Sequence, residues 1–179
     1  TAQGGWIVVR IIDSRGMQNA VTIADTRAFI KAVLPDEVIE GAGKGDKIEI
    51  ELLVTWLGTD AIPEKDRKLL EDAAVDHAKT IEGLQIGEFI DISLHYRVSG
   101  GEWIPVYQTS EEITLSIMIQ EKLQGKESVY YMLRVHGGRA DLLQDLDEET
   151  EVITFQTDLF SIYALAYTVA GQLIDTTHG

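Results

Sequence analysis

Alternating apolar and polar positions fill the C-terminal third of the chain and predict four consecutive β-strands. Between residues 129 and 136 every second residue is apolar or aromatic, which is the period of a strand. Gly137 and Gly138 follow this run, and two glycines between two such runs are a strong hairpin signal. The remaining three strands are expected at residues 139–143, 151–157 and 160–167.

The same alternation continues upstream and sets the fold class. Further strands are expected at residues 6–12, 21–23, 48–54, 89–98, 103–107 and 113–119. Many short strands separated by turns are typical of two packed sheets. The sequence therefore predicts a mainly β protein, an antiparallel β-sandwich of the immunoglobulin-like or Greek-key type.

Helical spacing is confined to the N-terminal half, where we expect one to three helical insertions. The best helix covers residues 63–79, because Pro63 suits a first helical position and Glu64 favours the positive end of the helix dipole. We expect this helix to be an excursion packed on an edge or an end of the sheets. Asp25 or Thr26 is expected to cap a helix that ends near Val33.

We expect residues 1–170 to form a single β-sandwich domain that includes the helical insertions. A further helical turn is expected after Pro35, and a cluster of glycines closes it. Residues 171–179 lose the alternating pattern, so we expect them to be a frayed tail or a linker. Because the chain begins with Thr1, the simplest expectation is a mature or excised fragment of a longer protein.

Charge and composition exclude several classes of function. The formal net charge is −15, which repels nucleic-acid phosphates and anionic membranes, so neither partner is expected. No run approaches the roughly 20 apolar residues that a spanning helix needs, so no membrane insertion is expected. The chain has no cysteine, which excludes a disulfide framework, a zinc–thiolate centre and a thiol nucleophile.

The densest acidic cluster lies between two predicted strands and is the candidate metal site. Its weak calcium candidates are Asp141, Asp145, Asp147 and Glu149. Carboxylate oxygens are hard ligands that suit calcium, but the spacing is not that of an EF-hand loop. The alternative is a solvated loop whose charge discourages association between sheet edges.

The four histidines, His77, His95, His136 and His178, do not have the spacing that places two metal ligands on one helix face. His95 and His136 both occupy the face opposite the aliphatic one in their strands. They are therefore candidates for neighbours across a sheet, and a solvated sheet face is the alternative.

Hydrolytic chemistry has two weak candidates. Ser161 lacks the flanking glycines of a nucleophile elbow and would need a base such as His136 within reach. The alternative is a strand residue whose hydroxyl bonds to an adjacent chain. Glu111 and Glu112 are consecutive on a strand, so they project to opposite faces and are poorly placed for joint acid–base work.

Two further features suit a surface module. Trp6, Trp56 and Trp103, together with the tyrosines, supply aromatic rings for stacking on a glycan, although packing within the sheets is the more ordinary use. Asn19 is the single asparagine, which allows at most one lysine–asparagine crosslink. A lysine–aspartate crosslink from Lys31 or Lys47 is also open.

The residues also resemble a known family. Residues 134–140 (RVHGGRA), 153–155 (ITF) and 160–164 (FSIYA), with upstream matches at 31–35, 47–54 and 86–94, resemble a β-domain of Gram-positive, largely Firmicutes, surface proteins. The resemblance covers about residues 20–170. It implies an extracellular location at the cell surface or cell wall, and it carries over no catalytic residue.

The leading hypothesis is a non-catalytic structural, stalk or adhesion-associated module of a bacterial surface protein. Its expected partners are neighbouring domains of that protein and a host or cell-wall ligand that the sequence does not identify. The alternative is a glycan- or peptide-binding module, with calcium assisting through the acidic cluster. A hydrolase is the third hypothesis, and no cofactor other than calcium is implied.

Overall fold

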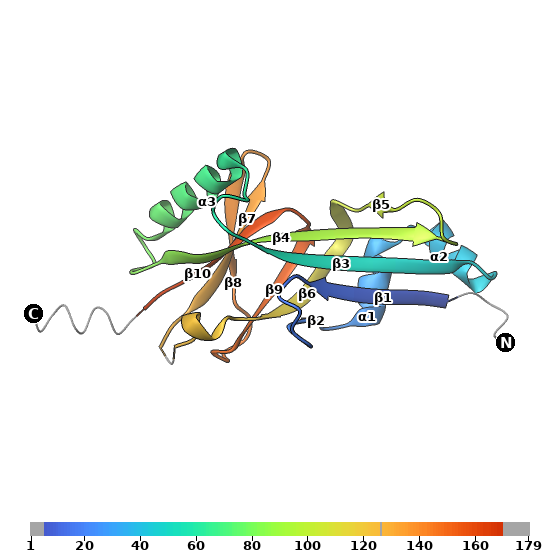
Figure 1. Ribbon diagram of the computed structural model, residues 1–179, viewed down its shortest axis with the longest axis horizontal. Helices are drawn as coiled ribbons and strands as arrows, with labels where there is room; N and C mark the ends of the chain where they lie inside the picture. The colour runs from blue at the N-terminus through green and yellow to red at the C-terminus, as the bar shows by residue number, and fades with distance from the viewer. Residues whose placement is uncertain (1–5, 126, 170–179) are drawn as a thin grey trace, which may run out of the picture.

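Two sheets pack against each other in a mainly β sandwich with few helices, as the sequence predicts (Figure 1). The computed structural model describes residues 6–125 and 127–169. The strands are β1 (Trp6–Asp13), β2 (Val21–Ile23), β3 (Lys47–Leu57), β4 (Gln85–Val98), β5 (Ile104–Pro105), β6 (Gln108–Met118), β7 (Tyr130–His136), β8 (Arg139–Gln144), β9 (Val152–Leu159) and β10 (Ile162–Tyr167). The helices are α1 (Thr26–Val33), α2 (Asp36–Gly43), α3 (Glu64–His77) and the short 3₁₀ helix η1 (Glu121–Leu123).

The strands divide unequally between the sheets. The larger sheet has the order β1-β3-β4-β10-β7-β8, with β5 paired to β4, and the smaller sheet has the order β2-β6-β9. Pairing is antiparallel throughout the described residues, except that β1 runs parallel to β3. The parallel pair is a finding that the alternating pattern did not predict, because periodicity is the same in both kinds of ladder.

The predicted hairpin in the C-terminal third is confirmed. β7 and β8 pair up to His136 and Arg139, and only Gly137 and Gly138 lie between them. Both glycines have a positive φ, 57° and 83°, as the tightest hairpin turns require. The strands that follow do not continue the same ribbon: β9 crosses to the smaller sheet, and β10 returns to pair with β4 and β7.

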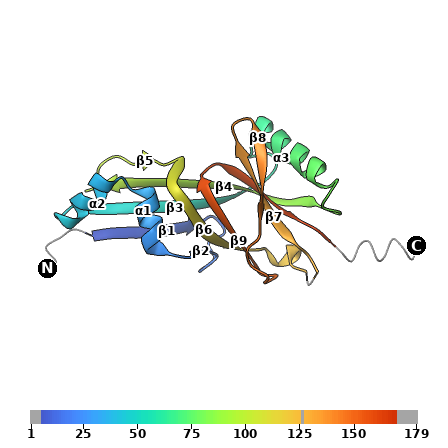
Figure 2. The same ribbon diagram turned by 180° about the vertical axis from the view of Figure 1, so that it is seen from behind.

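The longest pairing joins β3 to β4. It runs without interruption from Ile48 opposite Val98 to Leu57 opposite Phe89. Both strands follow the long axis of the molecule and connect the half that holds α1 and α2 to the half that holds α3 (Figures 1 and 2). β1 pairs with β3 on one side of this pair; on the other side β5 and β10 pair with β4, and β7 and β8 follow β10.

The main core lies on the inner face of the larger sheet, toward the smaller sheet. Alternate residues of β3 and β4 are buried there, with Ile48, Ile50 and Ile92 fully inaccessible to solvent. Phe29 of α1 belongs to the same core as Phe155 of the smaller sheet, so α1 extends the second layer. The predicted cap is present, because the Asp25 side chain accepts a hydrogen bond from the backbone N–H of Ala28.

The expectation that helix 63–79 packs on an edge or an end of the sheets is wrong. α3 lies on a face of the larger sheet, opposite the smaller sheet, and forms a second core with β10 and β7. Ala164 of β10 contributes to this second core, whereas its neighbour Leu165 belongs to the main one. β10 is therefore apolar on both sides, and α3 covers the side that the smaller sheet leaves bare.

Two other expectations differ in extent. The strand expected at residues 103–107 is reduced to β5, whose Pro105 has no backbone N–H to donate to a ladder. The tail expected at residues 171–179 lies outside the described residues.

Replacing Leu70 with alanine tests whether α3 is a structural cover. Leu70 is completely buried beneath the helix, so Leu70→Ala is expected to lower the free energy of unfolding by about 2–5 kcal/mol. Val75 lies on the same helix and is 68% exposed, so Val75→Ala serves as the control with a change of about 0.5 kcal/mol or less. Urea unfolding measures both. Equal effects of the two substitutions would contradict this placement of α3.

Candidate functional site

A network of charged side chains occupies the outer face of β1, β3 and β4, in the half that α3 does not cover. We call this surface the open face; its residues are Arg10, Glu49, Glu51, His95, Arg97 and Trp103. Glu49 lies opposite Arg97 across the β3–β4 ladder, and Glu51 lies opposite His95. On the other side of β3, Arg10 is the register partner of Glu51. Opposite charges therefore face each other across three adjacent strands.

Glu49 is the centre of this network. One carboxylate oxygen, Oε2, accepts a hydrogen bond from Arg10 Nη2 at 2.8 Å, and the other, Oε1, accepts one from Arg97 Nε at 2.9 Å. The two arginines cover the carboxylate so fully that Glu49 is only 3% exposed, although it points away from the main core. Their hydrogen bonds lower the pKa of Glu49 from 4.5 to about 2.

The second part of the open face joins a histidine to an aromatic ring. His95 Nε2 and Glu51 Oε1 are 2.8 Å apart, and the imidazole lies 4.2 Å from the ring of Trp103, centroid to centroid. The guanidinium of Arg97 lies over the same indole, 4.5 Å from its centroid. Trp103 thus covers both His95 and Arg97 of β4, an arrangement that holds the loop leading to β5 against the sheet.

A cavity of about 360 Å³ adjoins the open face at the β4–β5 pair. Asp91, Ser93 and His95 of β4 line it, together with Tyr107 and Ser161. Burial raises the pKa of Asp91 above its usual value, and a hydrogen bond from Ser93 opposes this shift in part. Tyr107, which lines the cavity, is 73% exposed. The cavity therefore combines polar groups with an exposed aromatic ring.

This cavity brings Ser161 and His95 to one place, but it does not build a catalytic pair from them. Ser161 Oγ donates a hydrogen bond to the carbonyl oxygen of Val135 on the neighbouring strand at 2.9 Å, as the structural alternative expects, although Ser161 itself lies just before β10 and not in a strand. His95 is paired with Glu51. Glu111 and Glu112 are both exposed on β6, away from this cavity. None of these groups has the nucleophile–base geometry of a hydrolase.

The three histidines that the structure describes do not form a common site. His95 lies on the outer face of the larger sheet, whereas His136 follows the inner-face series of β7, so the expectation that they share a face is wrong. His136 Nδ1 is 3.6 Å from Asp141 Oδ2 instead. His77 ends α3, and His178 lies outside the described residues.

The structure separates Asp141 from the other three calcium candidates, which line one small cavity. Asp141 lies on β8, where Arg134 and Arg139 pair with its carboxylate. Asp145 Oδ1 instead accepts hydrogen bonds from the backbone N–H groups of Asp147 and Thr154, both at 2.9 Å. Within residues 6–125 and 127–169, no three histidine, aspartate or glutamate side chains are grouped to hold a metal ion. Calcium binding stays a prediction without geometric support.

The loop beyond Asp145 uses its carboxylates in the same way. Asp147 Oδ1 accepts a hydrogen bond from the backbone N–H of Glu149 at 2.6 Å. The side chain of Glu149 is exposed. The acidic residues therefore fix the local turns of a loop between two strands, as Asx turns do.

The crosslink candidates lie at the surface. Asn19 is exposed in a turn with φ 59°, and Lys31 is exposed on α1. Lys47 is half-buried, with its ammonium 4.7 Å from the ring centroid of Trp6. Asn19 and Lys31 therefore lack the apolar pocket in which such a bond forms.

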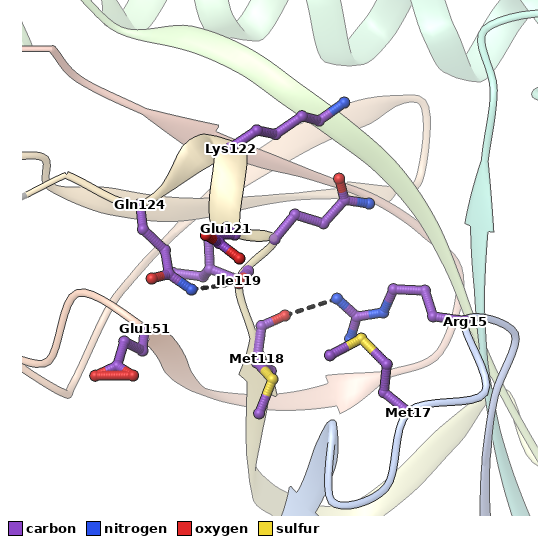
Figure 3. Close-up of a pocket in the computed structure, with 9 residues that line it drawn as sticks. Arg15, Met17, Met118, Ile119, Glu121, Lys122, Gln124 and Glu151 are labelled. Carbon is purple, nitrogen blue, oxygen red and sulfur yellow. Dashed lines mark hydrogen bonds between the residues drawn. The ribbon is translucent and has the colours of Figure 1, made fainter.

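A cavity of about 780 Å³ lies where the loop after β1 meets the connection from β6 to η1 (Figure 3). Its lining residues are Arg15, Met17, Met118, Ile119, Gln120, Glu121, Lys122, Gln124 and Glu151. Arg15 Nη1 donates a hydrogen bond to the carbonyl oxygen of Met118 at 2.9 Å. Sequence reasoning missed Arg15, because a lone arginine in a predicted turn gives no signal of burial.

No family model matches this chain, and no curated protein and no solved structure matches it either. The resemblance to surface proteins of Gram-positive bacteria therefore stays a prediction, and the site has to be interpreted from its own geometry.

The pH dependence of stability tests the role of Glu49. Its pKa is lower in the folded protein, so its contribution to stability is present above pH 4.5 and is lost as the pH falls toward 2. The difference in unfolding free energy between the wild-type protein and Glu49→Gln is therefore expected to be greatest above pH 4.5 and to shrink in acid. Urea unfolding over a pH series measures it.

Glu112→Gln is the matched control, because Glu112 is exposed on the smaller sheet. The difference in unfolding free energy between Glu112→Gln and the wild-type protein is expected to stay small at every pH. A difference for Glu49→Gln that does not change between neutral and acidic pH would contradict the stabilising role of the ionised carboxylate.

Proposed function

We propose that this chain is a non-catalytic structural or adhesion-associated module of a bacterial surface protein. In this proposal it lies outside the cell, at the surface or in the wall, and its partners are neighbouring domains of the same protein. The observation that supports it most is the position of the first and last strands. β1 starts at one end of the long axis and β10 finishes at the other (Figure 1).

This arrangement suits a module that transmits load. β1 lies along the long axis and pairs with β3 over all eight of its residues. A force between the two ends of the molecule would act along β1 and shear these residue pairs together. Pairs that are loaded together resist more force than pairs that open one after another, so the geometry favours a stalk.

The polar side chains give the second line of support. On the open face the charged side chains pair with one another; Glu49, for example, pairs with two arginines. Ser161 donates its hydroxyl to a backbone carbonyl oxygen. A reactive centre needs groups that are free to meet a substrate. No helix of the described chain has the length and apolar character to pass through a bilayer.

Single-molecule pulling tests the load-bearing role. The chain has no cysteine, so pairs of introduced cysteines define where force is applied. Handles at Trp6→Cys and Val169→Cys load β1 in shear. Handles at Val129→Cys and Gln144→Cys are the matched control, because they pull β8 away from β7 at the open end of that hairpin, one residue pair at a time.

The end-to-end geometry is expected to unfold at a distinctly higher force than the hairpin geometry at the same pulling speed. An end-to-end unfolding force equal to or below that of the hairpin would overturn the proposal of a load-bearing stalk.

The cavity beside the open face favours glycan binding as a second candidate function. Tyr107 exposes its ring beside Asp91 and His95, and sugar rings stack on aromatic rings while carboxylates accept hydrogen bonds from their hydroxyls. Calcium is not needed for this arrangement, because the acidic loop lies elsewhere.

A glycan array with Tyr107→Ala tests the second candidate. Any glycan that the wild-type protein retains is expected to bind the variant at least about tenfold more weakly, since an aromatic anchor is lost. Leu146→Ala is the control, because Leu146 is 58% exposed outside this cavity. No bound glycan, or equal binding by both variants, would remove this candidate.

A further inference from the structure

The geometry points to a binding site for a small zwitterion, an amino acid or short peptide with free termini, in the large cavity beside Arg15. In this site Arg15 would receive the carboxylate, and Glu151 with Glu121 would receive the ammonium group. This inference is independent of the structural role proposed above, which neither requires nor excludes it.

Arg15 has an unused hydrogen-bonding group in an enclosed position. Its side chain is nine-tenths buried. Its Nε donates to Asp13 Oδ2 at 3.1 Å, and its Nη1 donates to the carbonyl oxygen of Met118. Nη2 has no hydrogen-bond partner among residues 6–125 and 127–169 and is closed off from solvent. A buried nitrogen with two N–H donors left unpaired is rare in folded proteins, and a carboxylate is its natural acceptor.

The guanidinium is also held firmly in place. Its carbon Cζ lies 3.8 Å from the ring centroid of Trp56, and Trp56 Nε1 donates a hydrogen bond to Asp13 Oδ1 at 2.8 Å. Asp13, Arg15 and Trp56 therefore form one rigid group at the ends of β1 and β3. A fixed donor loses little freedom when it binds, which favours its use in recognition.

The charges around the cavity select the ligand. Arg15 and Lys122 are positive and Glu121 and Glu151 are negative, and Arg15 also pairs with Asp13 while Lys122 pairs with Glu88. Arg15 and Glu151 lie on opposite sides of the cavity (Figure 3). A ligand with one anionic and one cationic end matches this separation, whereas a simple anion would meet both glutamates.

Size and shape fit a ligand of this class. The volume of about 780 Å³ lies within the roughly 300–1,000 Å³ of small-molecule sites. Met17, Met118 and Ile119 provide apolar wall, and flexible thioethers adapt to varied side chains. Nη2 is closed off from solvent, so a ligand reaches it only when a neighbouring side chain moves; Met17 is 45% exposed and lies beside the guanidinium in Figure 3.

Titration followed by NMR tests the inference on the whole chain. The probe is the dipeptide leucyl-leucine with free termini, and the indole N–H signal of Trp56 reports on the guanidinium stacked over its ring. Three further probes vary one feature each: the N-acetylated dipeptide, the C-terminally amidated dipeptide and inorganic phosphate. A saturable shift of the Trp56 signal is expected with the free dipeptide.

Removing either terminal charge of the dipeptide is expected to weaken binding about tenfold, since each end loses a charge-assisted hydrogen bond. The indole signals of Trp6 and Trp103 should not move, because their rings stack with Lys47 and Arg97 and not with Arg15. No saturable shift with the free dipeptide would overturn the inference. Equal responses to the acetylated or amidated dipeptide, or to phosphate, would overturn the zwitterion assignment.

Variants separate recognition from folding. Glu151 is exposed, so Glu151→Gln should fold normally. The variant should bind the free dipeptide more weakly than the wild-type protein does, and bind the acetylated dipeptide equally well. Arg15→Lys keeps the charge but loses the guanidinium fork, and it should abolish the preference for a free carboxylate. Arg139→Lys is the matched control, because Arg139 is 74% exposed on β8. Equal binding by Arg15→Lys and Arg139→Lys would contradict the role of Arg15.

Discussion

The uninterrupted pairing of β3 with β4 is the constraint on which the rest of the structure depends. Side chains alternate between faces along both strands, so a shift of one residue would exchange the whole inner row for the outer row. In the observed register, Ile50 enters the main core and Glu49 meets Arg97. The ion pairs of the open face exist only in this register, so hydrophobic burial and charge pairing select the same alignment.

That pairing also explains why the outer face has two different halves. Near the start of β4, Phe89 belongs to the apolar core beneath α3. Near its end, His95 and Arg97 face glutamates of β3. A single helix of 14 residues is too short to cover strands that run the length of the sheet, so the uncovered half can stay soluble only with charged residues.

The sequence predicted what periodicity can encode and missed what it cannot. Alternation identified the strands and the Gly137–Gly138 hairpin, because both depend on neighbours in the chain. It did not reveal that β9 leaves for the smaller sheet or that β1 is parallel to β3, because a pattern gives a strand's faces but not its partners. The position of α3 had a signal in Ala164, which lies between the core residues Tyr163 and Leu165.

The candidate sites were harder to predict for the same reason. Glu49 and Arg97 are separated by 48 residues, and only the strand register brings them together. Arg15 is buried because the end of β1 meets the end of β6, so its position depends on the packing of two sheets. A ligand that contacted Arg15 only in this packed arrangement would stabilise the junction between the sheets by mass action. Binding at the cavity and the packing of the two sheets would then be linked, because both involve the contact between Arg15 and Met118.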